Sequence, residues 1–162
     1  MAEAAEKRRC LAAVRIRGVI RARRKARETL QMLRLIRNNH AVLIDDRSSY
    51  IGMLRQAQSF VTWGEASKET VITLLQKRGR LAGDKKLTAE YTQKVGYKSL
   101  EELAEAIHNC SVEYWKLPDT RPVFRLHPPS KGFRGKTKKA YGAGGETGYR
   151  GEHINELIKR MT

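Results

Sequence analysis

The sequence predicts an α+β fold that begins with a β-α-β-α-β unit. Three observations support this prediction: a strand-like alternation at residues 13–18, an amphipathic helical period over residues 23–37, and a continuous apolar run at residues 41–44. With 162 residues, of which 40% are hydrophobic, the chain is long enough for one domain with a substantial core. Because the connections between the elements are short, we expect a single sheet with helices packed on it.

The first strand and the first helix each place basic side chains opposite an apolar face. Alternation predicts that Val14 and Ile16 face a core, while Arg15 and Arg17 form a basic stripe on the other side of the strand. The helix has one apolar arc, and Leu35 is an exception on its polar side. The apolar arc consists of Ala22, Ala26, Thr29, Leu30, Met32, Leu33 and Ile36, and the opposite arc of Arg23, Arg24, Arg27 and Arg34.

Two more strands and a second helix complete the unit. The apolar run at residues 41–44 has the length of a central strand, and two aspartates follow it. Ser48 or Ser49 can cap a helix that extends to about residue 58. Residues 60–63 again have the composition of a strand.

The remaining chain is predicted to be helical first and mixed afterwards. Ser67, Thr88 and Ser99 each fit the N-cap of a short helix, and residues 154–161 fit an amphipathic terminal helix. Residues 123–126 fit a fourth strand, which runs into a glycine-rich basic loop at residues 130–150. We therefore divide the chain into a basic amino-terminal tail at 1–12, a core unit at 13–66, a helical segment at 67–117 and a carboxy-terminal extension at 118–162.

The excess positive charge is concentrated in two blocks. The chain has 33 basic and 17 acidic residues, a formal net charge of +16. Residues 7–37 contain twelve basic residues and one acid, Glu28, while residues 121–150 contain eight basic residues and one acid, Glu146. A one-sided surplus of this kind is typical of a surface that meets a polyanion. Nucleic acid is the favoured partner, ahead of a membrane surface, because the basic helix lacks an aromatic anchor.

Motifs for catalysis or metal binding are weak. Residues 130–137 nearly match a phosphate-binding loop, but Ser130 replaces its first glycine and no helical period follows. Asp45 and Asp46 could hold a metal ion, although strand-end aspartates are common in turns. Cys10 and Cys110 have neither the spacing of a zinc site nor that of a disulfide framework. We therefore expect no catalytic site, metal site, cofactor or small-molecule substrate.

Three aromatic residues lie among the basic residues of the second block. Phe133, Tyr141 and Tyr149 could stack on unpaired bases, or they could pack against the sheet. The composition does not separate RNA from DNA. Neither an apolar run of membrane-spanning length nor a secretory signal is present, so we expect a cytoplasmic protein.

Five segments together resemble a known family, the large-subunit ribosomal protein thirty family (the universal L-thirty proteins), in its longer archaeal and eukaryotic form. They are VRIRG at 14–18, ETLQMLRLIRNNHAVLIDD at 28–46, SYIGMLRQAQSFVTWGEAS at 49–67, LLQKRGRL at 74–81, and FRLHPPSKGFRGKTKKAYGAGGETGYRGEHINELIKRM at 124–161. The short tail before the first strand is similar to that of archaeal members.

The resemblance implies a ferredoxin-like β-α-β-α-β core with a helical insertion, an additional strand, a basic glycine-rich loop and a C-terminal helix. It also implies a structural place on large-subunit ribosomal RNA, beside neighbouring large-subunit proteins in the cytoplasmic ribosome, and no enzymatic activity. The alternatives are an architectural protein that binds DNA or non-ribosomal RNA, and an RNA-directed enzyme that uses Asp45 and Asp46.

The resemblance also indicates which residues face RNA: the first strand, the start of the next helix, and the glycine-rich loop. In this chain the corresponding residues are Arg15, Arg17, Arg21, Arg23, Arg24 and Arg27, together with Lys131, Arg134, Lys136, Lys138 and Lys139. The charge and aromatic patterns add Lys25, Phe133, Tyr141 and Arg150.

Overall fold

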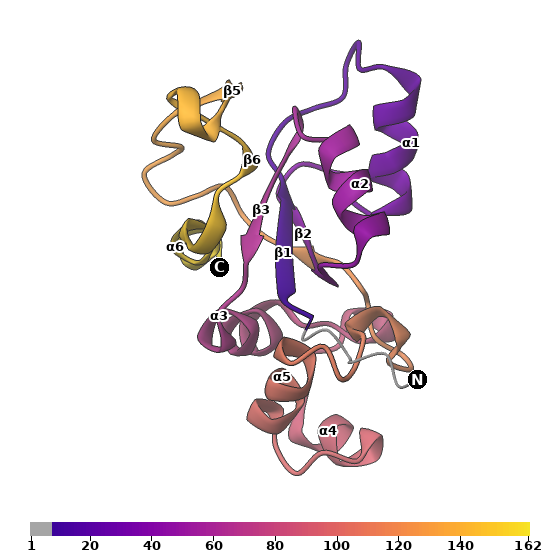
Figure 1. Cartoon of the computed structure of the whole chain (residues 1–162). Helices are drawn as coiled ribbons and strands as arrows, with labels where there is room; N and C mark the ends of the chain where they lie inside the picture. Colours follow the sequence, from indigo (N-terminus) through magenta and orange to yellow (C-terminus); the bar gives the residue numbers. More distant parts are fainter. Residues whose placement is uncertain (1–7) are drawn as a thin grey trace, which may run out of the picture.

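A six-stranded sheet organises the structure, a computed structural model that describes residues 8–162 (Figure 1). The strand order is β4-β2-β1-β3-β6-β5, and β1 pairs antiparallel with both β2 and β3. This confirms the predicted α+β fold and its β-α-β-α-β core. The core elements are β1 (Cys10–Arg15), α1 (Arg24–Met32), β2 (His40–Asp45), α2 (Ser48–Gln56) and β3 (Val61–Glu65). Of the predicted tail at 1–12, residues 1–7 lie outside the described part, and β1 begins at Cys10.

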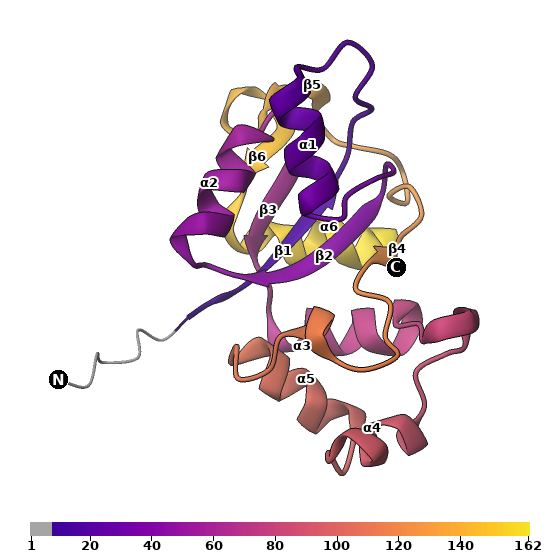
Figure 2. The same ribbon diagram turned by 90° about the vertical axis from the view of Figure 1, so that its right-hand side faces the viewer.

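Strand β1 is buried on both faces of the sheet. Ala12 and Val14 pack with the helices on one face, and Leu11 and Ala13 pack with α1 and α2 on the other. Figures 1 and 2 show α1 and α2 together on one side of the sheet, with α6 (Ile154–Met161) on the opposite side. The basic stripe predicted for this strand is therefore wrong at Arg15, whose side chain is buried because both faces are covered.

The end of α1 differs from the predicted helix at residues 23–37. The helix ends at Met32, and Arg34 follows with a left-handed φ of 62°, so the chain reverses. The Leu35 backbone N–H donates to the Leu30 carbonyl at 2.8 Å, which closes the turn. As a result Leu35 is fully buried, while Met32 and Ile36, predicted to be apolar-face residues, are exposed.

The helical segment packs under the end of the sheet where β1 begins (Figure 2). Ser67 and Ser99 cap their helices as predicted: each hydroxyl accepts a backbone N–H bond, from Thr70 and Glu102 respectively, at 3.2 Å. No side-chain cap is formed by Thr88 or at the start of α2, whose N-cap residue is Arg47. The helices are α3 (Lys68–Thr73), which continues as a π-helical turn at Leu74–Arg78, α4 (Ala89–Val95) and α5 (Leu100–His108). None of the helices in the described residues is long and apolar enough to cross a membrane.

The carboxy-terminal extension adds three strands to the sheet. The predicted fourth strand is β4 (Phe124–Arg125), which pairs with β2. The glycine-rich segment was expected to be a loop, but it contains β5 (Lys136–Ala140) and β6 (Gly145–Tyr149), and β6 pairs in parallel with β3. The sequence of these two strands shows no alternation of apolar and polar residues, because β5 is almost entirely exposed and β6 is short and contains two glycines.

A buried polar cluster attaches β6 to β3. The Arg150 guanidinium donates to the Glu146 carboxylate at 2.6 Å and to the Thr62 hydroxyl at 2.7 Å, and Glu146 also accepts the backbone N–H of Gly135 at 2.7 Å. Both charged side chains are almost completely buried. Arg150 therefore has a structural role, and its burial does not favour the RNA contact predicted for it.

One glycine in β3 permits a close approach of two backbones. A Cβ atom at Gly64 would lie 1.9 Å from the carbonyl oxygen of Gly151, in the turn that precedes α6. This distance is far below van der Waals contact, and a backbone atom cannot move aside as a side chain does. Glycine is therefore required where α6 docks on the sheet.

We expect Gly64→Ala to lower the free energy of unfolding by about 2 kcal/mol or more, because the new methyl group forces β3 and the α6 turn apart. Gly52→Ala is the matched control: Gly52 lies in the exposed middle of α2 with nothing near its Cβ position, and alanine should raise stability by about 0.5–1 kcal/mol. Urea unfolding followed by circular dichroism measures both changes. Two changes of the same sign would contradict this account.

Arg150→Met should destabilise the protein by about 3 kcal/mol, because it leaves the Glu146 carboxylate buried without its cation. Adding Glu146→Gln should recover part of that loss, since the second change removes the unpaired charge. The comparison of single and double variants by chemical denaturation is decisive. A double variant less stable than Arg150→Met would show that the pair does not act as a unit.

Candidate nucleic-acid interface

Cations from both basic blocks lie at one end of the molecule. Figures 1 and 2 both place the connection from β1 to α1 and the strand β5 at the end opposite the helical segment. We call this surface the basic end. Its cations are Arg17, Arg21, Arg23, Arg24, Lys25, Arg27, Lys136, Lys138 and Lys139.

Helix α1 presents cations at its amino-terminal end, where its own dipole disfavours them. Arg23 is the N-cap residue, Arg24 and Lys25 follow, and the first turn contains no acidic residue and no side-chain cap. Arg24 bonds to Glu28 at 2.6 Å, but both side chains are at least half exposed, so this pair contributes little stability. The arrangement suits an anion, which would interact with the free helix N–H groups and the cations together.

Arg15 belongs to the interior and not to this surface. Its guanidinium donates to the backbone carbonyl of Leu35 at 3.1 Å, to that of Ile36, and to that of Arg17 at 3.0 Å. Burial lowers the pKa of Arg15 from its ordinary value. The residue ties the end of β1 to the turn after α1, and its burial does not favour the RNA contact predicted for it.

Arg17 and Arg21 remain at the surface. The Arg17 guanidinium lies 5.4 Å from the centre of the Phe60 ring, which holds the half-buried side chain beside the end of β1. Arg21 is exposed and has a left-handed φ of 60°, an unusual conformation for a long side chain. Such backbone strain is found preferentially at functional segments.

The second block divides into free lysines and an ion-paired arginine. Lys136, Lys138 and Lys139 on β5 are exposed, and no carboxylate of residues 8–162 forms an ion pair with them. Arg134 precedes β5 and pairs with Glu156 of α6 at 2.6 Å, although both side chains stay more than half exposed. Lys131 is exposed and also has a positive φ.

The three aromatic residues have different environments. Phe133 is partly buried against the core, which is the packing alternative. The Tyr141 ring is covered by the Arg150 guanidinium at 4.8 Å and lies 6.0 Å from the His153 ring. Tyr149 is 54% exposed, and its hydroxyl donates to Glu65 at 2.5 Å. Tyr149 is thus the aromatic side chain with the most open face of the three.

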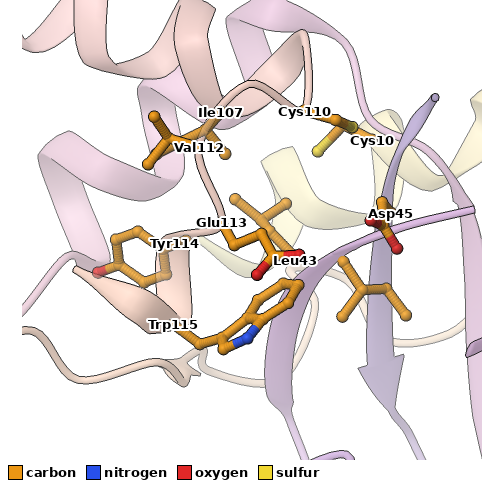
Figure 3. Close-up of a pocket in the computed structure, with 10 residues that line it drawn as sticks. Cys10, Leu43, Asp45, Ile107, Cys110, Val112, Glu113, Tyr114 and Trp115 are labelled. Atoms are coloured by element: carbon orange, nitrogen blue, oxygen red, sulfur yellow. The ribbon is translucent and has the colours of Figure 1, made fainter. Parts of the chain in front are cut away.

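The first of the two strand-end aspartates is engaged in an ion pair. Asp45 is buried and accepts three bonds of 2.6–2.9 Å from Arg47. Figure 3 shows Asp45 beside a small cavity that Cys10 and Cys110 also line, and its volume of about 10 Å³ is that of a single water. Burial raises the pKa of Cys110 to about 11, which disfavours its thiolate form. No group of three or more possible metal ligands occurs in residues 8–162.

Sequence reasoning missed one further cationic surface. Arg9 and Arg55 border a groove between α2 and β3, and Trp63 lies at its base. Arg9 lies within the first basic block, but neither arginine is among the individual residues predicted to contact RNA. The sequence contains one signal for this surface. Arg55 lies four residues after Ile51, at the edge of the apolar face of the second predicted helix.

Comparison with known proteins agrees with this architecture. A family model described as ribosomal protein L30p/L7e matches residues 11–61, which cover most of the β-α-β-α-β unit. Over 149 residues the chain is 50% identical to the large ribosomal subunit protein uL30 of Thermofilum pendens, covering 91% of this chain and 96% of that protein. It is 51% identical to uL30 of Ignicoccus hospitalis, with 91% and 94% covered, and 47% identical to uL30 of Methanopyrus kandleri, with 90% and 99% covered. At this identity over nearly the whole length of both chains, the protein belongs to the uL30 family of large ribosomal subunit proteins.

Proposed function

We propose that the protein is a structural constituent of the large ribosomal subunit and binds ribosomal RNA through its basic end. The observation that supports this most directly is that cations from two charge blocks, far apart in sequence, lie together at one end of the fold. Family membership supports the ribosomal assignment and a non-enzymatic role. A place in the subunit locates the protein in the cytoplasm.

The mechanism is recognition of RNA shape. Arginine and lysine side chains neutralise phosphates and release counterions, while the packed sheet holds them at fixed separations. The start of α1 and the lysines of β5 would contact different stretches of backbone, so that only an RNA folded to bring those stretches together fits both. The acidic helices of the other end are free to meet neighbouring ribosomal proteins.

Replacing Arg23, Arg24 and Arg27 with alanine should weaken binding to large-subunit ribosomal RNA by about tenfold or more without unfolding the protein, because all three side chains are exposed. The slope of log affinity against log salt should fall by roughly one for each phosphate that the variant no longer binds. Filter binding at several salt concentrations measures both effects.

The matched control removes three exposed lysines of the helical segment, Lys77, Lys86 and Lys98, and so makes the same change in net charge. It should leave RNA affinity nearly unchanged. Equal weakening by both triple variants would mean that net charge alone, and not the basic end, determines binding.

The wild-type protein should lose affinity for ribosomal RNA by about 10³–10⁵-fold between 50 and 200 mM salt, as expected for roughly 6–10 phosphate contacts. At physiological salt it should bind duplex DNA of matched length far more weakly, because the phosphate spacing of the folded RNA is absent. Comparable affinity for the two would instead favour an architectural nucleic-acid-binding protein.

A further inference from the structure

Helices α1 and α2 leave part of one sheet face uncovered. Each helix with its side chains is about 10 Å wide and strands are about 4.8 Å apart, so two helices cover roughly four strands. The sheet has six strands, and β6 and β5 form the edge that lies beyond β3. On this face a groove therefore runs between α2 and the β3–β6 edge.

The groove has an apolar base and an aromatic wall. Leu11 and Trp63 of the sheet and Ile51 of α2 line it, and its volume is about 410 Å³, in the range of small-molecule sites. The Tyr149 ring forms the wall on the β6 side, 6.3 Å from the Trp63 ring centre. Because the Tyr149 hydroxyl bonds to Glu65, the ring is held in place while half of the residue remains open to solvent.

Cations stand on the borders of this groove. Arg9 and Arg55 line it, and Arg9 has only a long contact of 3.8 Å with Glu65. Within residues 8–162, Arg55 has no ion-pair partner. The groove continues past these two arginines into a wider hollow of about 800 Å³, which Arg8 and Arg47 line as well. Figures 1 and 2 show the last turn of α2, which carries Arg55, toward the basic end, whereas Arg9 directly precedes β1, whose start lies toward the helical segment.

We propose that this groove binds one unpaired nucleotide of the RNA, its base against Tyr149 and its phosphate at Arg9 and Arg55. The proposal rests on the function proposed above and extends the RNA contact from the basic end along α2. Base stacking on aromatic rings and phosphate contact by arginine are the two interactions that single-stranded nucleic acid requires.

Two acidic residues of the groove suit the edge of a base. Asp46 lines it without a hydrogen-bond partner in residues 8–162, and Glu65 lies beside Tyr149. Amino and imino groups on the edge of a base can donate hydrogen bonds to these carboxylates.

The test uses the full-length protein and large-subunit ribosomal RNA. Tyr149→Leu, which removes the aromatic face but keeps an apolar side chain, should weaken binding by about 5- to 150-fold, the range for loss of one stacked base. Tyr149→Phe keeps the ring and should retain most of the affinity. Arg55→Ala should also weaken binding, whereas Lys86→Ala, in the helical segment, should not.

Ultraviolet crosslinking of the same complexes locates the contact. A nucleotide adduct on the peptide that contains Tyr149, retained in Tyr149→Phe and absent in Tyr149→Leu, is the expected result.

If the Arg23, Arg24 and Arg27 variant weakens binding but the groove variants do not and no adduct forms, the groove proposal is wrong while the proposed function stands. If none of these variants weakens binding, the proposed function itself fails. A third outcome is that Tyr149→Leu binds naked RNA with unchanged affinity and that Tyr149 crosslinks to a protein segment in the assembled subunit. In that case the groove binds a protein, and the nucleotide proposal is wrong.

Discussion

The burial of β1 on both faces determines where the cations around it lie. A guanidinium buried in such a sheet needs hydrogen-bond acceptors for its N–H groups, because an unpaired buried charge costs several kcal/mol. Arg15 meets this condition with three backbone carbonyls, and Arg150 meets it with Glu146 and Thr62 at the β3–β6 edge. The cations of the basic end lie instead in the connection after β1, on α1 and on the exposed strand β5, and there they remain available to a partner.

Sequence periodicity predicted the core unit because its signals are local. The apolar run of β2, the caps at Ser67 and Ser99, and the buried face of α6 all follow from spacing within one element. The errors depend on contacts between distant segments. Arg15 looks like a surface residue until the turn after α1 supplies its acceptors, and Arg150 looks like an RNA contact until β6 docks beside Thr62. Leu35 is buried because Arg34 reverses the chain, which a helical projection does not include.

Some of the exposed cations lie at positions where they lower the stability of the free protein. The start of α1 would be more stable with an acidic first turn and a side-chain cap, yet it carries Arg24 and Lys25. Arg21 adopts a left-handed conformation that glycine or asparagine would accept more easily. A fold selected for stability alone would not combine these features at one end. Binding of a polyanion offsets such costs, because it neutralises the repulsion that the free protein bears.

The addition of β6 to the sheet links the two surfaces physically. The β6 strand carries Tyr149 to the side of Trp63, and its pairing with β5 carries three lysines toward the start of α1. The same addition widens the sheet beyond the reach of α1 and α2, so the open face over β3 arises from the extension that builds the basic end. The buried Arg150–Glu146 pair holds β6 in this position without touching the surface. Glu146, the single acid of the second block, therefore has a structural role. By fixing β6, it helps to set the distances between the lysines of β5, the arginines of α1 and the Tyr149 ring of the groove.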